Sequence, residues 1–400
     1  MPAYSADYLF PVSGPAIAHG AIIFDSEGRV EWIGTRDECP TEDIQILAPG
    51  HVLIPGFINA HCHLELSHLV GKVDTGTTLL PFLIGVVSQR EVDQSEIDAA
   101  IQAQDAYMWQ VGIQAVGDIC NKADTAAIKR SSPIKYYSFV EMFDFLQADR
   151  AEETFNQYLS VYEKQAGSDS GNAKSAVPHA PYTVSNPLYH RINELNDGQG
   201  TVSIHLQETP AENELFQTKS GPFLSFFEGF GASLASFSAT GQASIYHALG
   251  QMDPNCRTLF VHNTTTVAED IAAAKAWGQN GVFWATCPNA NLYIENRLPR
   301  YDIFLQADAK VCIGTDSLTS NWQLSILDEM KTISRYQSYV PFQTLLQWAT
   351  LNGAEALGFD HDLGSLEVGK TPGLLALGGL TGNTPESYRI NSNTSVSRLI

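Results

Sequence analysis

Eight short apolar runs, separated by longer stretches, constrain the fold of this 400-residue chain more than any other feature. Each run has strand length and is rich in Val, Ile, Phe or Tyr, as buried strands are. Several connecting stretches carry Ala, charged and apolar residues at helical spacing, most clearly residues 95–110 and 267–278. Strands that alternate with helices predict an α/β fold with parallel strands, a TIM-like (β/α)8 barrel. The runs are residues 52–58, 112–119, 134–143, 175–181, 201–208, 257–263, 281–287 and 310–316.

The two ends of the chain depart from this alternation. Residues 20–34 are typical of two strands joined by a tight turn at 26–28, and short strands are also expected at 363–370 and 373–377. Short strands at both ends can pair with each other. We therefore expect a small β-sandwich domain built from both termini, residues 1–54 and 356–400, beside a barrel of residues 55–355.

Polar residues with side chains capable of catalysis or metal binding lie at or near the carboxyl ends of several of these runs. Barrel enzymes carry their active sites at the carboxyl ends of the strands, so residues about 250 positions apart are expected to meet at one rim. His61 and His63 also lie one residue apart on an extended segment, so their side chains point to the same side. The polar residues at these ends are His61, His63, His179, His205, Glu208, His262 and Asp316.

Four of these residues can form one mononuclear metal site: His61, His63, His205 and Asp316. Three neutral imidazoles and a carboxylate suit one divalent ion per chain, with Zn²⁺ expected and Fe²⁺ as the alternative. An ion of this kind generates hydroxide from water, and Glu208 is placed to carry protons for it. No lysine ends the fourth run, where a bridge between two metal ions would be needed, and this favours one ion.

Each of these residues has a simpler interpretation when it is taken singly. A histidine at a strand end can hydrogen-bond a loop, Glu208 can be a solvated loop carboxylate, and Asp316 can cap a helix. Their occurrence together at the ends of five separate strands favours a shared site.

Composition excludes several other classes of function. The formal net charge of −21 disfavours binding to nucleic acid or to anionic membranes. No apolar stretch reaches membrane-spanning length, and the first residues lack a basic region followed by an apolar core, so a cytoplasmic protein is expected. The six cysteines form no CxxC, and no GxGxxG or Walker loop is present. The expected partner is a small-molecule substrate, and the sequence allows a homodimer as well as a monomer.

Five sequence motifs occur in an order that resembles the amidohydrolase superfamily. They are PGFINAHCHL (residues 55–64), HLQE (205–208), VHN (261–263), CPNAN (287–291) and GTDS (314–317). The HxxE motif resembles that of the cytosine and adenosine deaminase branch. The resemblance implies a (β/α)8 barrel with a β-sandwich from both termini. It also implies metal binding by the four ligands named above, proton transfer by Glu208, orientation of the attacking hydroxide by His262, and acceptance of the hydroxide proton by Asp316.

Two narrower motifs, HLELS (63–67) and PHAPYTV (178–184), are similar to those of the aminodeoxyfutalosine deaminases of menaquinone biosynthesis. This similarity predicts hydrolytic deamination of an adenine-nucleoside-like compound such as 6-amino-6-deoxyfutalosine. The expected substrate contacts are His179, Asn291 and Arg297. Arg297 is either the partner of a substrate carboxylate or an ordinary surface arginine. Residues 292–299 depart from the glycine-containing loop of many relatives.

Two alternatives remain at this stage. Other amidohydrolases use the same machinery on other substrates, as guanine or cytosine deaminases, formimino-compound hydrolases and triazine chlorohydrolases do. A barrel without catalytic activity, kept as a scaffold, is the alternative from a different class. The presence of every expected ligand argues against the scaffold.

Overall fold

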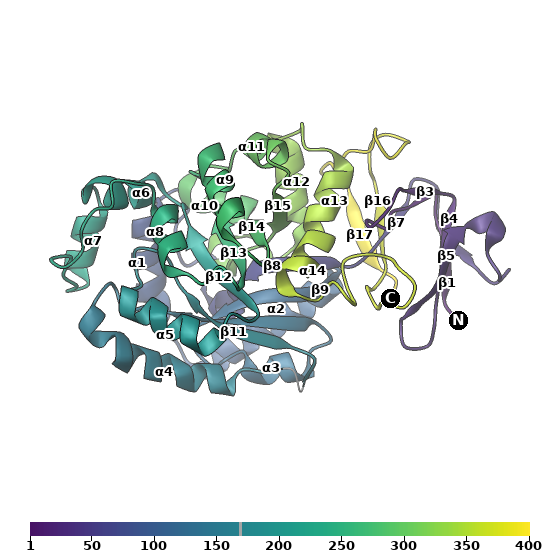
Figure 1. Ribbon diagram of the computed structural model, residues 1–400. Coiled ribbons are helices and arrows are strands. Elements are labelled where there is room, and N and C mark those ends of the chain that lie inside the picture. The colour runs from purple at the N-terminus through teal and green to yellow at the C-terminus, as the bar shows by residue number, and fades with distance from the viewer. Residues whose placement is uncertain (168–169) are drawn as a thin grey trace.

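The computed structural model describes residues 1–167 and 170–400 (Figure 1). Within these residues, eight strands form two parallel four-stranded sheets, in the orders β11-β10-β9-β8 and β12-β13-β14-β15. The alternating α/β architecture with parallel strands that the sequence predicts is confirmed. The strands are β8 (Phe57–Cys62), β9 (Ile113–Cys120), β10 (Lys135–Met142), β11 (Ala173–Pro178), β12 (Thr201–Leu206), β13 (Arg257–His262), β14 (Val282–Thr286) and β15 (Lys310–Ile313).

The first predicted strand is divided between two sheets. Residues 52–54 form β7, which pairs with terminal strands, and β8 begins only at Phe57. The break falls at Pro55, which has no backbone N–H to donate to a sheet, and at Gly56. A Cβ on Gly56 would lie 2.2 Å from Gln114 Cγ and 2.8 Å from the carbonyl oxygen of Pro372. The expected run 52–58 is therefore corrected to two strands, and His61 lies inside the second.

The two parallel sheets contact each other at both edges. Cys62, the last residue of β8, forms an isolated parallel bridge with Asp316, just past β15. At the other edge, the backbone N–H of His205 in β12 donates to the carbonyl oxygen of His179 at 2.9 Å. Both links lie at carboxyl ends of strands, where the polar residues are found.

Helices lie between and around the strands (Figure 1). The predicted helices at 95–110 and 267–278 are confirmed as α2 and α9. The helices pack their apolar sides on the strands, as α4 does on β10 and α5 on β11. The α-helices are α1 (Leu79–Gln89), α2 (Gln94–Gln110), α3 (Ala126–Ser131), α4 (Ala151–Lys164), α5 (Asn186–Asn196), α6 (Pro210–Thr218), α7 (Phe223–Gly229), α8 (Ser244–Gln251), α9 (Ala268–Trp277), α10 (Pro288–Glu295), α11 (Tyr301–Gln306), α12 (Ile326–Tyr336), α13 (Phe342–Ala349) and α14 (Leu351–Leu357). Short 3-10 helices are η1 (Arg36–Glu38), η2 (Leu64–Leu69), η3 (Ala148–Arg150) and η5 (Leu318–Ser320).

Strands from both ends of the chain pair with one another, at the end of the molecule where Figure 1 marks both termini. One sheet has the order β17-β16-β7-β2-β3, and the other has the order β5-β4-β1-β6. β16 runs antiparallel to β7, with Leu375 opposite Ile54. These strands are β1 (Ala3–Ser5), β2 (Tyr8–Leu9), β3 (Ile17–Ala18), β4 (Gly20–Phe24), β5 (Val30–Thr35), β6 (Gln45–Ile46), β7 (Val52–Ile54), β16 (Leu375–Gly378) and β17 (Ser395–Arg398).

A separate apolar cluster lies at the other end of the molecule, where α1, α6 and α7 gather (Figure 1). It joins Phe82 of α1, Phe216 of α6, Phe223 and Phe227 of α7, and Tyr182 from the loop after β11. This cluster forms one wall over the carboxyl ends of the parallel strands. Among the described residues, no helix is long and apolar enough to span a membrane.

Candidate active site

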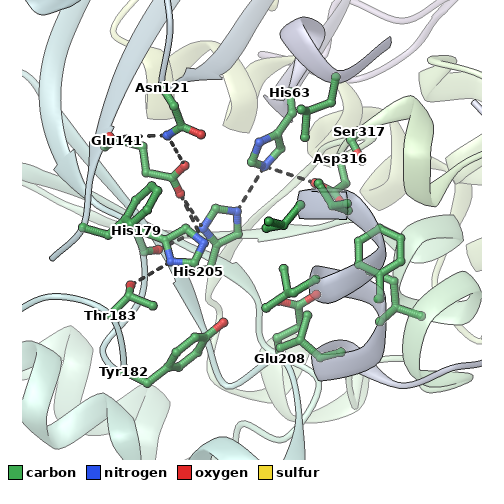
Figure 2. A pocket seen from close by; sticks show the side chains of 18 of the residues that line it. His63, Asn121, Glu141, His179, Tyr182, Thr183, His205, Glu208, Asp316 and Ser317 are labelled. Atoms are coloured by element: carbon green, nitrogen blue, oxygen red, sulfur yellow. Dashed lines mark hydrogen bonds and ion pairs between the residues drawn. The ribbon is translucent and has the colours of Figure 1, made fainter. Parts of the chain in front are cut away.

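The carboxyl ends of β8, β12 and β15 bring together the four residues that the sequence predicts as metal ligands. The Nε2 atoms of His63 and His205 lie 3.2 Å apart. Asp316 Oδ1 lies 3.5 Å from Nε2 of His61 and 3.3 Å from Nε2 of His63. Figure 2 shows His63, His205 and Asp316 around one space. Residues from three strands, 255 positions apart at most, therefore converge on a single point.

A close approach of two strand ends directs Asp316 toward the histidines. A Cβ on Gly314 would lie 2.8 Å from both the Cβ and the carbonyl oxygen of His61, so glycine lets β15 pass against β8. The N–H groups of Thr315 and Asp316 then both donate to the His61 carbonyl oxygen, at 2.9 and 3.0 Å. The Asn59 side chain bonds Thr315 twice, and the left-handed φ of 57° at Asp316 completes the turn.

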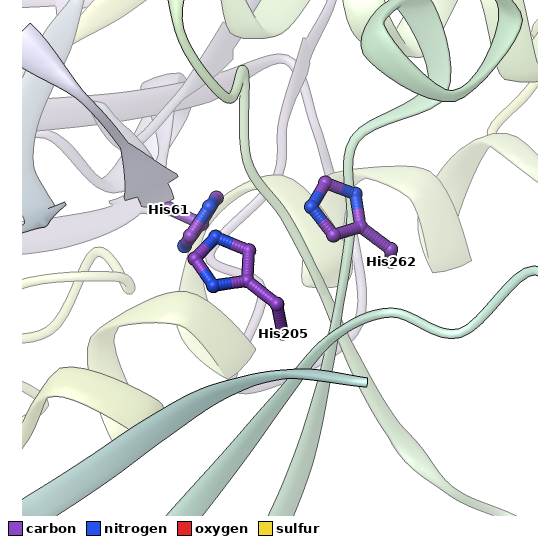
Figure 3. A group of neighbouring side chains, drawn as sticks. All are labelled: His61, His205 and His262. Carbon is purple, nitrogen blue, oxygen red and sulfur yellow. The ribbon is translucent and has the colours of Figure 1, made fainter. Parts of the chain in front are cut away.

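Burial keeps the imidazoles of His63, His205 and His262 neutral. Desolvation lowers the pKa of His63 to about 3 and that of His262 to about 4, and it lowers the pKa of His205 well below its ordinary value. Both ring nitrogens of His61 lack a hydrogen-bond partner among the described residues. The rings of His61, His205 and His262 gather closely (Figure 3). Buried nitrogen lone pairs without donors are costly unless something binds them, and neutral imidazoles are the form that binds metal ions.

Asp316 supplies the negative charge of the cluster. Burial would raise the pKa of this carboxyl, but the nearby imidazoles of His61, His63 and His262 hold the pKa well below the ordinary value. Ser320 donates to Oδ2 at 2.5 Å, which leaves Oδ1 facing the histidines. Neutral nitrogens and one ionised carboxylate are the donor set that a Zn²⁺ site uses, so these residues fit such an ion.

A left-handed turn after β12 carries Glu208 into the same cavity. Gln207 has a φ of 50°, and the Glu212 carboxylate of α6 accepts the backbone N–H groups of Gln207 and Glu208 at 3.0 and 3.2 Å. Glu208 Oε1 lies 3.7 Å from His262 Nε2. Burial raises the pKa of Glu208 well above its ordinary value, because little solvent or positive charge reaches the ionised form. Glu208 is thus a buried acid beside the cluster.

Asn291 was expected to contact substrate, and the structure places it elsewhere. It is buried in α10, and its Oδ1 accepts a hydrogen bond from His262 Nδ1 at 2.9 Å. Because an amide oxygen only accepts, His262 Nδ1 carries the proton and its Nε2 keeps the lone pair. Asn291 is not among the residues that line the cavity. Its contact orients His262.

Arg297 is also corrected, because the structure does not bring it to the cavity. α10 ends at Glu295, and Asn296 takes a left-handed φ of 48° that turns the chain outward. The Arg297 side chain is exposed and does not line the cavity. Glu295 instead ties this loop to α1 by accepting the backbone N–H of Leu79 at 2.8 Å.

His179 does line the cavity, and it lies beside a polar network that sequence reasoning missed. Glu141 of β10 lies 3.5 Å from His179 and 3.4 Å from His205. Asn121 donates to Glu141 at 2.8 Å, and Arg90 bonds both Asn121 and Glu65. A charged residue inside the apolar run 134–143 was the signal for Glu141, since a buried charge at a strand end calls for a function or a partner.

Apolar and aromatic side chains form the remaining wall of the cavity. Phe143 and Phe145 follow β10, and the Phe145 ring stacks on Phe230 at 5.6 Å between centroids with 16° between planes. Phe226 and Phe82 continue this wall. The cavity therefore combines a cluster of metal-ligand type, a buried acid, a polar network and an aromatic wall suited to a flat organic molecule.

Comparison with known proteins identifies the family to which the chain is similar. A model described as the amidohydrolase family matches residues 52–398. An adenosine deaminase of Helicobacter pylori is 28% identical over 336 residues, which cover 82% of this chain and 79% of that protein. The solved Helicobacter pylori aminofutalosine deaminase in complex with methylthio-coformycin has a TM-score of 0.79 at 24% identity, with 96% of this chain and 94% of that chain covered. A Xanthomonas campestris adenosine deaminase with bound zinc has a TM-score of 0.72 at 23% identity, with coverage of 94% and 84%.

Proposed function

The chain belongs to the amidohydrolase family, and on that premise we propose that it is a metal-dependent deaminase of an adenine nucleoside. The observation that carries this proposal is the placement of Glu208. Hydrolytic removal of a ring amine needs an acid that can protonate the ring, and Glu208 is a buried carboxyl with a raised pKa beside the histidine cluster. The adenosine deaminase relative supports the substrate class.

His61, His63, His205 and Asp316 are the proposed ligands of one divalent ion, Zn²⁺ in the first place and Fe²⁺ as the alternative. When bound, such an ion lowers the pKa of water and supplies a nucleophile at neutral pH. Support comes from the neutral imidazoles of His63 and His205, from the orphaned nitrogens of His61, and from the zinc in the Xanthomonas campestris deaminase.

The protein's own groups carry the protons of the proposed reaction. Glu208 delivers its proton to the ring nitrogen next to the amine-bearing carbon, and Asp316 accepts a proton from the attacking water. His262, held by Asn291, directs its Nε2 lone pair into the cavity and orients that water. A carbon–oxygen bond forms and the carbon–nitrogen bond breaks. The amine takes the proton that Asp316 accepted and leaves as ammonia, the proton from Glu208 stays on the ring nitrogen of the product, and the proton of the added hydroxyl returns to Glu208.

Among adenine nucleosides, 6-amino-6-deoxyfutalosine, a compound of menaquinone biosynthesis, is our preferred substrate. The aromatic wall of Phe143, Phe145, Phe226 and Phe230 suits an aryl group at the far end of the nucleoside. The fold shared with the Helicobacter pylori aminofutalosine deaminase adds to this support. Arg90 replaces Arg297 as the cation nearest the substrate, because Arg90 lines the cavity.

We propose in addition that the eight parallel strands close into one (β/α)8 barrel of residues 55–355, with residues 1–54 and 356–400 as a β-sandwich. The Cys62–Asp316 bridge and the bond from His205 to the His179 carbonyl support closure at the two edges. The break at Pro55 and Gly56 supports the first boundary.

Ammonia release from a panel of aminopurine nucleosides, guanine and cytosine tests the proposal directly. We expect turnover of adenine nucleosides, with 6-amino-6-deoxyfutalosine preferred over adenosine by on the order of 10²-fold in kcat/KM. His61→Ala should lose both turnover and bound metal, which metal analysis measures. Ammonia from guanine or cytosine, with none from any adenine nucleoside, would contradict the substrate class.

A further inference from the structure

We infer that Asp118, itself held by Lys129, is a positioning residue for the proposed metal ligand His63. Asp118 belongs to β9 and Lys129 to α3, and neither lines the cavity. The inference rests on the proposed function, since it assumes that His63 binds a metal ion. It assigns a task to a buried pair of charges that neither the histidine cluster nor the proton transfers use.

The pair of Asp118 and Lys129 is completely buried. Both side chains are 0% exposed, and Lys129 Nζ lies 2.6 Å from Asp118 Oδ2. Lys129 also donates to Ser138 Oγ of β10 at 3.0 Å, which fixes the direction of its ammonium group. Burial by itself would lower the pKa of Lys129, but the Asp118 carboxylate holds that pKa above its ordinary value, so the lysine stays charged. Buried ion pairs often add no stability over apolar side chains of similar size, so stability alone does not account for this pair.

The second oxygen of Asp118 holds the residue that follows His63. Oδ1 accepts the backbone N–H of Leu64 at 2.8 Å. The backbone pairing of β8 with β9 shifts register between Asn59 and Cys62, and β8 ends at Cys62. The side chain of Asp118 therefore supplies an acceptor just past the end of the regular strand.

This hydrogen bond constrains the backbone of His63. His63 lies between β8 and η2 with a φ of −121° and a ψ of 78°, which is neither strand nor helix geometry. The bond to Leu64 fixes the peptide group on one side of His63, and the strand residue Cys62 fixes the peptide group on the other. The direction of the His63 side chain, whose Nε2 lies 3.3 Å from Asp316 Oδ1, is thus set from both sides. Metal–nitrogen bonds are short and directional, so a displacement of this backbone should weaken metal binding.

Two double variants separate the hydrogen bond to Leu64 from the two charges. Asp118→Leu/Lys129→Met replaces the pair with apolar side chains of similar size, so that both charges leave together and the acceptor for Leu64 is lost. Asp118→Asn/Lys129→Gln also removes both charges, but the Asn oxygen can still accept from Leu64. The Gln side chain can then bond the Asn amide and Ser138. Only the first variant should therefore disturb His63.

The affinity of the metal-free protein for Zn²⁺, measured by competition with a chelator, is the main readout. We expect Kd to rise on the order of 10-fold to 100-fold in Asp118→Leu/Lys129→Met, as it commonly does when a residue that orients a ligand is lost. Asp118→Asn/Lys129→Gln should keep the wild-type Kd. Asp362→Leu/Lys135→Met, the same change at a partly exposed ion pair outside the cavity, is the matched control and should also keep it. Urea denaturation of the metal-free proteins checks that each variant is folded.

Three results would overturn the inference. One is an unchanged Kd in Asp118→Leu/Lys129→Met, for which Asp118→Val/Lys129→Leu is the substitute if the first variant does not fold. Another is an equal loss of affinity in Asp118→Asn/Lys129→Gln, since that variant keeps the acceptor. The third needs no variant: the Leu64 amide hydrogen of the metal-free wild type should be protected from exchange, and exchange as fast as in an exposed loop would remove the bond on which the inference depends.

Failure of the proposed function is distinguishable from failure of this inference, because zinc affinity and hydrogen exchange need no substrate. A wild-type protein that binds zinc and releases no ammonia from any nucleoside would contradict the deaminase, while the zinc affinities of the variants would still decide the role of Asp118. Normal ammonia release by the wild type, with an unchanged Kd in Asp118→Leu/Lys129→Met, would overturn the role of Asp118 alone. A wild-type protein that binds no zinc would overturn both.

Discussion

Burial sets the protonation states of single residues in this cavity. Desolvation raises the pKa of Glu208 and lowers the pKa of His63 and His262, so burial favours the uncharged form of the carboxyl and of both imidazoles. An exposed glutamate at neutral pH would have no proton to give. The same low-polarity surroundings thus favour a protonated carboxyl at Glu208 and neutral imidazole nitrogens close to it.

Replacing Glu208 with Gln tests the role of this proton. Glu208→Gln keeps the size of the side chain and removes the titratable group, so kcat should fall by on the order of 10² or more while metal content stays near the wild-type value. Steady-state kinetics and metal analysis measure the two quantities. Loss of the metal would show instead that Glu208 is a ligand, and an unchanged kcat would remove it from the mechanism.

At the scale of elements, left-handed turns at strand ends aim the functional side chains. Gln207 after β12, His262 at the end of β13 and Asp316 after β15 have φ values of 50°, 75° and 57°. Non-glycine residues adopt this region only when neighbouring contacts compensate the strain. At Gln207 the compensation comes from α6, whose Glu212 accepts two consecutive backbone N–H groups.

Glu212→Gln should therefore misdirect Glu208 without touching the metal ligands. An amide has one oxygen to accept with, so one of the two N–H groups would lose its partner, and the turn would relax. We expect kcat to fall on the order of 10-fold, with metal content unchanged, because small displacements of a catalytic group are costly. Glu214→Gln, on the exposed side of the same helix, is the matched control and should behave like the wild type. Full activity in Glu212→Gln would show that the turn at Gln207 keeps its conformation without both hydrogen bonds to residue 212.

On the scale of the whole molecule, buried carboxyls link elements that are distant in sequence. Glu329 of α12 accepts the backbone N–H of Asn289 at the start of α10 and the side chain of Asn321 after η5. Burial raises the pKa of Glu329 from 4.5 to about 8. Its folded pKa thus lies above its unfolded pKa, and the folded state holds a proton that the unfolded state has lost between these values.

The contribution of Glu329 to the free energy of unfolding should consequently fall as the pH rises from about 4.5 to about 8. The contribution of Glu329 is fully present below the lower value and is lost above the higher one. Urea denaturation at several pH values should show a shallower decline for Glu329→Gln than for the wild type. Glu386→Gln, the same change at an exposed position, should decline as the wild type does. Parallel curves for Glu329→Gln and the wild type would contradict the shift.

The cluster of His61, His63, His205 and Asp316 was predictable because it follows from strand order alone. Each residue lies near the carboxyl end of a predicted strand, and parallel strands gather these ends at one rim. Glu141 has an equivalent place in β10 and was not singled out; its surroundings depend on Asn121 and Arg90, which belong to other elements. The sequence left open whether Arg297 faces the cavity, and the structure places it on the surface, after the left-handed residue Asn296.

By itself, the sequence determined the alternation of strands and helices, the parallel direction of the strands and the meeting of the proposed ligands at one rim. These properties depend on periodicity and on residue types at strand ends, which are local and repeat along the chain. The tertiary structure alone decided that residues 52–58 divide between two sheets at Pro55 and Gly56. It also decided that Asn291 lies behind His262 and that a network from Arg90 to Glu141 leaves one oxygen free. Those outcomes depend on contacts between segments far apart in sequence, where packing space and hydrogen-bond partners are set by the whole fold.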